Sequence, residues 1–192
     1  MMNLIRYNQP AKKWREALPL GNGITGIMVF GSLKKERLCF NGGTLWSGYP
    51  KNYDSPASLE NLEKVRELIF AGKNSEADAL CQEKLTGFYS EAFMPLGDVL
   101  LKFKNTDNIG FQRSLDLSKG LHTVKANGCV SEAFSSYTDR VSAYRITAEK
   151  PFFVKIKAKS KLKYNTETEE NSLFLLGNAP DYAAPNYLIK ER

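Results

Sequence analysis

The chain has 192 residues and a formal net charge of +6, from 27 Lys and Arg against 21 Asp and Glu. Its length allows one substantial domain or two small ones. No apolar run approaches the length of a transmembrane helix, and the first residues lack the apolar core of a signal peptide. Cys39, Cys81 and Cys129 are odd in number and far apart, which argues against a disulfide framework or a zinc site and predicts a reducing, cytoplasmic location.

The first glycine cluster, Gly21-Asn22-Gly23-Ile24-Thr25-Gly26, matches the spacing of a dinucleotide-binding loop. That motif binds a pyrophosphate only when a strand precedes the glycines and a helix follows them. Here Pro19 precedes them, and two strand-like runs follow, residues 27–31 and 33–40. We therefore reject a nucleotide site and expect a tight turn at the entrance to a sheet.

The second glycine cluster spans residues 41–50 and surrounds Trp46, which makes it the candidate binding site of the chain. Aromatic faces can stack on the C–H faces of sugars, and polar side chains beside them can bind the hydroxyl groups. The predicted sugar-binding side chains are Asn41, Thr44, Trp46 and Tyr49, with Asn52 and Tyr53 close in sequence. Two other interpretations remain open: Trp46 fills a gap under the loop, or the loop packs against another domain.

A helical hairpin is predicted around residues 58–86. Leu59, Leu62, Val65 and Ile69 recur at helical spacing after Ser58, which is a possible N-cap, and Ala71-Gly72 would end this helix. Ser75-x-x-Asp78 resembles a capping box that opens a second helix, which would end near Gly87.

From Asp98 onwards the pattern is that of short strands separated by turns. The candidate strands are residues 99–103, 111–117, 121–126, 129–137, 141–148, 152–158 and 172–176. Asn127-Gly128 is a strong signal for a two-residue hairpin turn, residues 105–108 form another predicted turn, and residues 165–171 are a predicted exposed loop. The fold class is therefore mainly β, a large antiparallel β-sandwich that is mostly a meander and carries the helical hairpin as an insert.

Lysines alternate with apolar residues in the strand predicted over residues 152–158. Lys155, Lys157 and Lys159 fall on the opposite side to Phe152, Val154, Ile156 and Ala158. A lysine row on a wet strand face keeps the strand soluble and protects an edge, which is our main interpretation. The alternative is a phosphate-binding stripe, but no aromatic residues alternate with the lysines to stack bases, so we expect no nucleic-acid partner.

The chain offers little catalytic chemistry of its own. Asp98 and Asp139 are expected in turns, and Asp116 is expected to pair with Arg113. His122 is the only histidine, which excludes a histidine-based metal site or triad. We therefore predict no catalytic residue, no metal and no cofactor within this chain.

A series of ordered motifs resembles the start of glycoside hydrolase family 95. These motifs are Trp14 with residues 17–31, Glu36-Arg37, residues 41–50, residues 69–73 with Glu76-Ala77, residues 95–99, residues 113–117, residues 132–136, and residues 176–180 with 185–187. Two departures concern polar positions: Gly42 stands where the family usually has Glu, and Asn178 and Asp181 stand where it usually has Arg and His.

The resemblance implies that residues 1–192 form the N-terminal supersandwich-like domain of an enzyme resembling inverting α-L-fucosidases. The last motif precedes the usual end of that domain, so we expect its closing strands and the catalytic (α/α) barrel to lie outside residues 1–192. The implied partners are a fucosylated glycan, bound by the full-length enzyme, and the barrel domain, with no membrane. The chain alone is expected to support the barrel without catalysis. The alternative is a standalone carbohydrate-binding module that uses the Trp46 loop.

Overall fold

The computed structural model describes residues 3–52, 54, 58–86, 91–104 and 109–184. The chain divides into two units, Met1–Trp46 with Phe93–Pro180, and Ser47–Ala92 with Asp181–Arg192, and each is described by itself. Within the described residues, no helix is both long and apolar enough to cross a membrane. Over the same residues, His, Cys, Asp and Glu form no group of three that could hold a metal ion.

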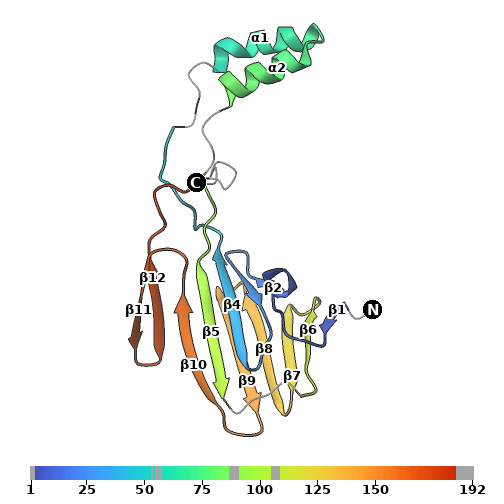
Figure 1. The fold of residues 1–192 in the computed structure, drawn as a ribbon, viewed down its shortest axis with the longest axis vertical. Helices are drawn as coiled ribbons and strands as arrows, with labels where there is room; N and C mark the ends of the chain where they lie inside the picture. Colours follow the sequence, from blue (N-terminus) through green and yellow to red (C-terminus); the bar gives the residue numbers. More distant parts are fainter. Residues whose placement is uncertain (1–2, 53, 55–57, 87–90, 105–108, 185–192) are drawn as a thin grey trace. The chain divides into compact units, whose positions relative to one another are not determined.

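The first unit contains two five-stranded antiparallel sheets (Figure 1). The strands of sheet A, in spatial order, are β1 (Leu4–Tyr7), β6 (Gln112–Asp116), β7 (Leu121–Ala126), β8 (Cys129–Ser136) and β9 (Val141–Ala148). Those of sheet B are β10 (Phe153–Lys159), β5 (Gly97–Lys104), β4 (Lys35–Gly42), β3 (Thr25–Val29) and β2 (Leu18–Gly21). A separate hairpin consists of β11 (Tyr164–Glu169) and β12 (Ser172–Gly177), and a 3₁₀ turn spans Trp14–Glu16.

The inner faces of the two sheets share one hydrophobic core. Sheet B contributes Leu18, Leu20, Ile27, Val29, Leu38, Leu101 and Phe103, and sheet A contributes Leu115 and Ala133. Alternate residues of these strands point inward, as the period of two requires. Both sheets also run largely in sequence order, from β2 to β5 and from β6 to β9. The predicted sandwich and its meander are confirmed.

The glycine cluster forms the turn of a β-hairpin. Gly21 at the end of β2 pairs with Gly26 in β3, and Asn22 occupies the turn between them. The Asn22 side chain accepts hydrogen bonds from the amides of Ile24 and Thr25, and its own amide group donates to the Ser136 carbonyl of sheet A (3.1 Å). The turn therefore closes the hairpin and ties it to the other sheet, which is the sheet entrance that the sequence predicted.

The second unit contains the predicted helical hairpin. Its helices are α1 (Ser58–Phe70) and α2 (Asn74–Leu80), and a π-helical turn, Cys81–Leu85, continues α2. Val65 and Ala77 are buried. The capping-box prediction was wrong, because the helix begins at Asn74 and Lys73, at its N-cap, makes no side-chain cap bond. The Ser58 side chain and Gly87 lie outside the described residues.

Among the predicted turns, Asn127-Gly128 is confirmed, since both residues have positive φ angles (40° and 70°) between β7 and β8. The predicted loop over residues 165–171 was wrong, because most of it forms β11. Thr166 and Thr168 favour extended backbone, and the β11 backbone pairs along its whole length with the apolar strand β12. The predicted turn at residues 105–108 lies outside the described residues.

Candidate functional site

The end of β4 and the start of β5 form the surface that carries Trp46. Gly43 and Thr44 form a turn after β4, held by a hydrogen bond from the Gly43 amide to the Ile24 carbonyl (2.8 Å). Beyond it, the Met94 amide donates to the Leu45 carbonyl (2.9 Å), and Trp46 forms an isolated antiparallel bridge with Phe93. Residues 47–92 form an insertion between β4 and β5, and the two chain segments that flank it are held together by backbone hydrogen bonds.

Trp46 is an exposed side chain held in a fixed orientation. Its relative exposure is 48%, so the prediction that it fills a gap under the loop was wrong. The indole N–H donates to the Gly43 carbonyl (3.1 Å), and the ring meets Phe93 edge to face at a centroid distance of 5.4 Å. Phe93 and Leu96 are exposed to 45% and 37%. We call Trp46, Phe93 and Leu96 the aromatic edge.

The predicted site residues fall into both units. Asn41 lies half-buried in β4 opposite Gly26, and Thr44 is exposed in the turn that holds the Trp46 indole. Tyr49 belongs to the second unit, where it is exposed and the Lys51 ammonium lies 4.9 Å from its ring centre. The structure thus groups Asn41, Thr44 and Trp46 in the first unit. Asn52 belongs to the second unit, and Tyr53 lies outside the described residues.

Phe93 was missed by the sequence reasoning because it lies 47 positions after Trp46. A usable signal existed nevertheless. When an insertion separates two adjacent antiparallel strands, the residues that flank it must lie close together, and Phe93 and Leu96 lie within four positions before β5. With a held, exposed indole and an adjacent phenyl ring, the aromatic edge can stack on a sugar or pack against an apolar protein surface.

The second glycine cluster closes the base of the insertion in the second unit. Ser47 and Ala92 exchange hydrogen bonds, and the Ser47 hydroxyl donates to Glu91 (2.9 Å). Lys51 forms an ion pair with the same carboxylate (2.6 Å). Gly48 has a φ of 93°, and a Cβ there would lie 2.2 Å from Glu91 Cδ, so only glycine leaves room for this carboxylate.

A buried polar cluster lies inside the sandwich, and the sequence reasoning did not identify it. Glu36 is 1% exposed and accepts hydrogen bonds from the backbone amides of Gly31, Ser32 and Arg37 and from the Tyr144 hydroxyl. Burial raises the pKa of Glu36 to about 7, although these hydrogen bonds oppose the shift. Burial also raises the pKa of Tyr144.

Arg113 and His122 complete this cluster from sheet A. Arg113 donates to the carbonyls of Gln9 and Glu16 (both 2.8 Å), and its guanidinium lies 4.4 Å from the centre of the Tyr7 ring. Arg113 and His122 are essentially fully buried. Burial, together with the charge of Arg113, lowers the pKa of His122 to about 4. Arg113 therefore fastens the N-terminal segment to the sandwich, and His122 is a neutral histidine in the same buried cluster.

Two predicted roles of carboxylates were wrong. Asp116 does not pair with Arg113, because it accepts the amides of Ser118 and Lys119 in its own turn (2.9 and 3.3 Å). Asp98 lies in β5 rather than in a turn, and forms an ion pair with Arg37 of β4 (2.9 Å). Asp139 follows β8 in a turn, as predicted, and accepts a hydrogen bond from the Ser136 hydroxyl (2.6 Å).

Comparison with known proteins gives matches over nearly the whole chain. Residues 5–190 match the family model described as glycosyl hydrolase family 65, N-terminal domain. The chain is 29% identical to alpha-L-fucosidase 2 of Arabidopsis thaliana, over 97% of this chain and 23% of that protein. It is 31% identical to probable alpha-fucosidase A of Aspergillus niger, over 69% of this chain and 18% of that protein.

A third match is probable alpha-fucosidase A of Aspergillus oryzae, with 26% identity over 92% of this chain and 25% of that protein. The chain thus spans a quarter or less of the length of these curated relatives. The matches confirm that the motifs of this chain resemble the N-terminal domain of α-L-fucosidases.

Proposed function

This chain belongs to the glycosyl hydrolase family 65 N-terminal domain family, and from that membership we propose that it is the non-catalytic domain of an α-L-fucosidase-type glycosidase. In this proposal it packs against a helical catalytic barrel and supports it, and the full-length enzyme hydrolyses fucosylated glycans with inversion. The match to residues 5–190 carries the proposal, and the names of the α-fucosidase relatives support the substrate class.

The aromatic edge is the proposed contact surface for the barrel. Trp46 and Phe93 stay exposed although each is a large side chain held in place by neighbours. Exposed aromatic residues that are already ordered lose little conformational entropy when a partner covers them, and they dominate many protein interfaces. A surface of this kind suits a permanent contact between domains of one chain.

Three carboxylates of the first unit, Glu36, Asp98 and Asp116, are engaged within the fold, which supports a non-catalytic role for them. Glycoside hydrolysis usually requires two carboxyl groups that face a substrate from opposite sides. Asp98 instead pairs with Arg37, Glu36 accepts four hydrogen bonds inside the core, and Asp116 binds two amides of its turn. Each of these three carboxylates is therefore bound to other groups of the same fold.

Hydrolysis of a nitrophenyl α-L-fucoside tests this function. The purified chain of 192 residues should release no nitrophenol above the buffer rate. The protein encoded by the complete reading frame that contains these residues should release it, with inversion at the anomeric carbon. Release by the 192-residue chain alone would contradict the non-catalytic role, and preference of the complete protein for another sugar would contradict the substrate class.

The exposed Trp46 ring favours one second candidate, a carbohydrate-binding module that acts through Asn41, Thr44 and Trp46 of the first unit. The chain has two tryptophans, Trp14 and Trp46, so fluorescence titration with a fucosylated oligosaccharide has a built-in control. Saturable quenching that survives Trp14→Ala and disappears in Trp46→Ala is expected from a binding module. The absence of a saturable fluorescence change would contradict this second candidate.

The cytoplasmic location stays a prediction.

A further inference from the structure

The outer face of sheet B carries seven basic side chains on three adjacent strands. Residues of β10, β5 and β4 stand opposite one another in the register Lys155–Lys102–Lys35, so three lysines form one row across the sheet. We call the whole set the basic face; its members are Lys35, Arg37, Lys102, Lys104, Lys155, Lys157 and Lys159. The residues that alternate with them on β4 and β5, such as Leu38, Leu101 and Phe103, lie in the core, so these basic side chains point to solvent.

Edge protection does not explain this arrangement. In sheet B only β10 and β2 are edge strands, whereas β5 and β4 are interior. Lysines on an edge strand discourage pairing with another chain, but Lys102 and Lys35 stand on interior strands, and the backbone at Lys102 is paired on both sides. The solubility role predicted for Lys155, Lys157 and Lys159 therefore leaves the lysines of the interior strands unexplained.

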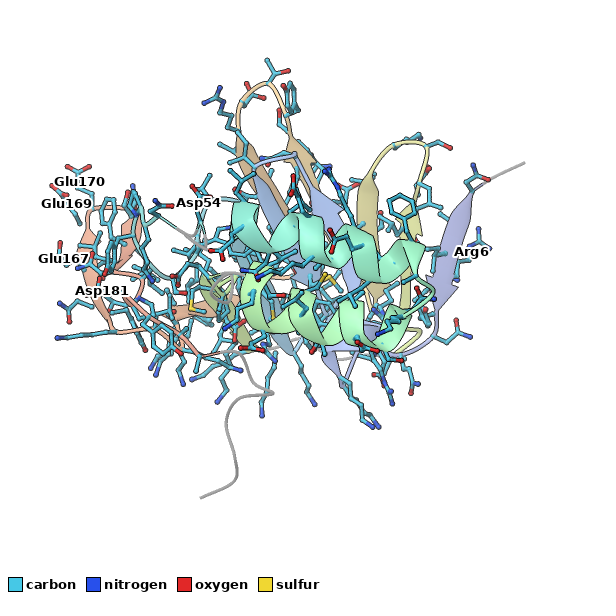
Figure 2. The ribbon with its side chains drawn as sticks, turned by 90° about the horizontal axis from the view of Figure 1, so that it is seen from above. Arg6, Asp54, Glu167, Glu169, Glu170 and Asp181 are labelled. Atoms are coloured by element: carbon cyan, nitrogen blue, oxygen red, sulfur yellow. The ribbon has the colours of Figure 1, made fainter. Side chains whose placement is uncertain are left out.

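The row is also electrostatically unfavourable for the isolated fold. Like charges directly opposite each other in a sheet lower its stability. Within β4, β5 and β10, all of them described, Asp98 is the only carboxylate on this face, and it is engaged by Arg37. In the described part of the chain, Lys35, Lys102 and Lys155 form no ion pair. Figure 2 shows Glu167, Glu169 and Glu170 grouped instead at the hairpin of β11 and β12.

The basic face is hollowed and has an apolar floor. One hollow of about 540 Å³ is lined by Phe30, Lys35, Leu100, Lys102, Lys155 and Lys157, together with Lys12, Arg37, Leu101 and the buried Glu36. A second, of about 630 Å³, is lined by Lys102, Lys104, Phe153, Val154 and Lys155. Both hollows share Lys102 and Lys155, so they meet at the middle of the lysine row. Apolar side chains between ammonium groups suit a ligand with both C–H surfaces and repeated negative charges.

We propose that the basic face binds a linear sulfated polysaccharide. Six of the seven basic residues are lysines, and the single arginine is already paired with Asp98. Arginine recognises carboxylates and phosphates in a planar, bidentate manner, whereas the lysine ammonium acts as a point charge, which needs no planar partner and accommodates a sulfate group. The choice of a polysaccharide over another polyanion, nucleic acid included, rests on the proposed glycosidase function.

Three polymers with one backbone test the proposal: dextran sulfate, carboxymethyl dextran and dextran, each titrated into the 192-residue chain. The chain should bind dextran sulfate at least tenfold more tightly than carboxymethyl dextran and should not bind dextran. The double variant Lys102→Gln/Lys155→Gln should lose at least tenfold in affinity for dextran sulfate. The control variant Lys119→Gln/Lys125→Gln changes the same net charge at two exposed lysines outside the basic face, and should stay within twofold of the parent chain.

Equal losses in the two double variants would show an effect of net charge alone and would overturn the proposal. Tighter binding to carboxymethyl dextran or to double-stranded DNA would overturn the assigned ligand. Thermal unfolding verifies the fold of each variant, and Lys155→Gln on the edge strand provides a milder second variant with a smaller expected loss. Because no fucoside hydrolysis is measured, failure here is distinct from failure of the proposed glycosidase function.

Discussion

At the scale of single residues, His122 and Glu36 place two ionisable groups with opposite responses to pH in one core. The folded pKa of His122 is about 4, below its ordinary 6.5, so stability is lost as the pH falls through this range. The folded pKa of Glu36 is about 7, above its ordinary 4.5, so stability is lost as the pH rises through that range. The two contributions oppose each other between about pH 4.5 and 6.5.

Removing His122 should expose this balance. In His122→Leu the acid-side loss disappears, because the unfolded chain no longer takes up a proton that the native core excludes. The free energy of unfolding of the parent minus that of the variant should therefore fall by about 3 kcal/mol between pH 7 and pH 4. Urea denaturation across this range measures it, and no other histidine contributes because the chain has only one. A difference that stays constant with pH would contradict a neutral, buried His122.

Gly48 is a single residue on which the packing of Glu91 against Ser47 and Lys51 depends. Gly48→Ala must displace Glu91 from Ser47 and Lys51, and it also forces a side chain into a positive φ. Gly72→Ala is the matched control in the same unit, because its φ is also positive (76°) but nothing lies within 4 Å of an added Cβ. Gly48→Ala should lower the unfolding free energy by about 1–2 kcal/mol more than the control does. Equal losses in the two variants would show that the contacts of Glu91 with Ser47 and Lys51 contribute nothing to the unfolding free energy.

At the scale of elements, local patterns predicted the strands whose inward and outward residues alternate. The bounds of β7 and β9 agree with their predicted ranges, and the positive φ angles of Asn127-Gly128 explain why that dipeptide marked the hairpin. Sequence reasoning missed β11 because its residues are polar on both faces, and its strand conformation comes from pairing with β12. Residues 18–21 were not predicted as a strand because Pro19 cannot donate a backbone hydrogen bond. They form β2 nevertheless, because β2 is an edge strand and an edge strand tolerates proline.

The candidate site was predicted only in part, for a related physical reason. Trp46 stood out because glycines surround it, but its contact with Phe93 depends on strand pairing across an insertion. The buried cluster of Glu36, Arg113 and His122 could not be predicted from local sequence, because Arg113 donates to backbone carbonyls at residues 9 and 16, about a hundred positions away. Asp116, three positions from Arg113, offered a nearer partner in sequence but bonds to its own turn. Long-range contacts of this kind leave no local periodicity.

The hairpin of β11 and β12 carries a correctable strain. Glu170 has a φ of 46°, a conformation that glycine and asparagine tolerate better than glutamate. Glu170→Asn should therefore raise the unfolding free energy by about 0.5–1 kcal/mol, without the added backbone entropy of glycine. Thermal unfolding of the variant measures the change. A lower melting temperature would contradict the assigned turn, and Glu169→Asn, one position earlier in the strand, serves as the control.

At the scale of the whole molecule, the two surfaces of the first unit have different proposed partners. The aromatic edge is apolar and ordered, which suits a permanent contact with a catalytic domain. The basic face is charged and hollowed, which suits reversible binding of a polyanion. Binding at the basic face should therefore weaken with salt, whereas docking at the aromatic edge should persist.

The proposed support of a catalytic barrel is tested most directly by hydrogen–deuterium exchange. The 192-residue chain is compared with the protein encoded by the complete reading frame that contains it. Our account predicts slower exchange in the complete protein for the amides around Trp46 and Phe93, and unchanged exchange for Lys102 and Lys155 on the basic face. Equal exchange at Trp46 and Phe93 in both proteins would contradict docking of a catalytic domain at the aromatic edge.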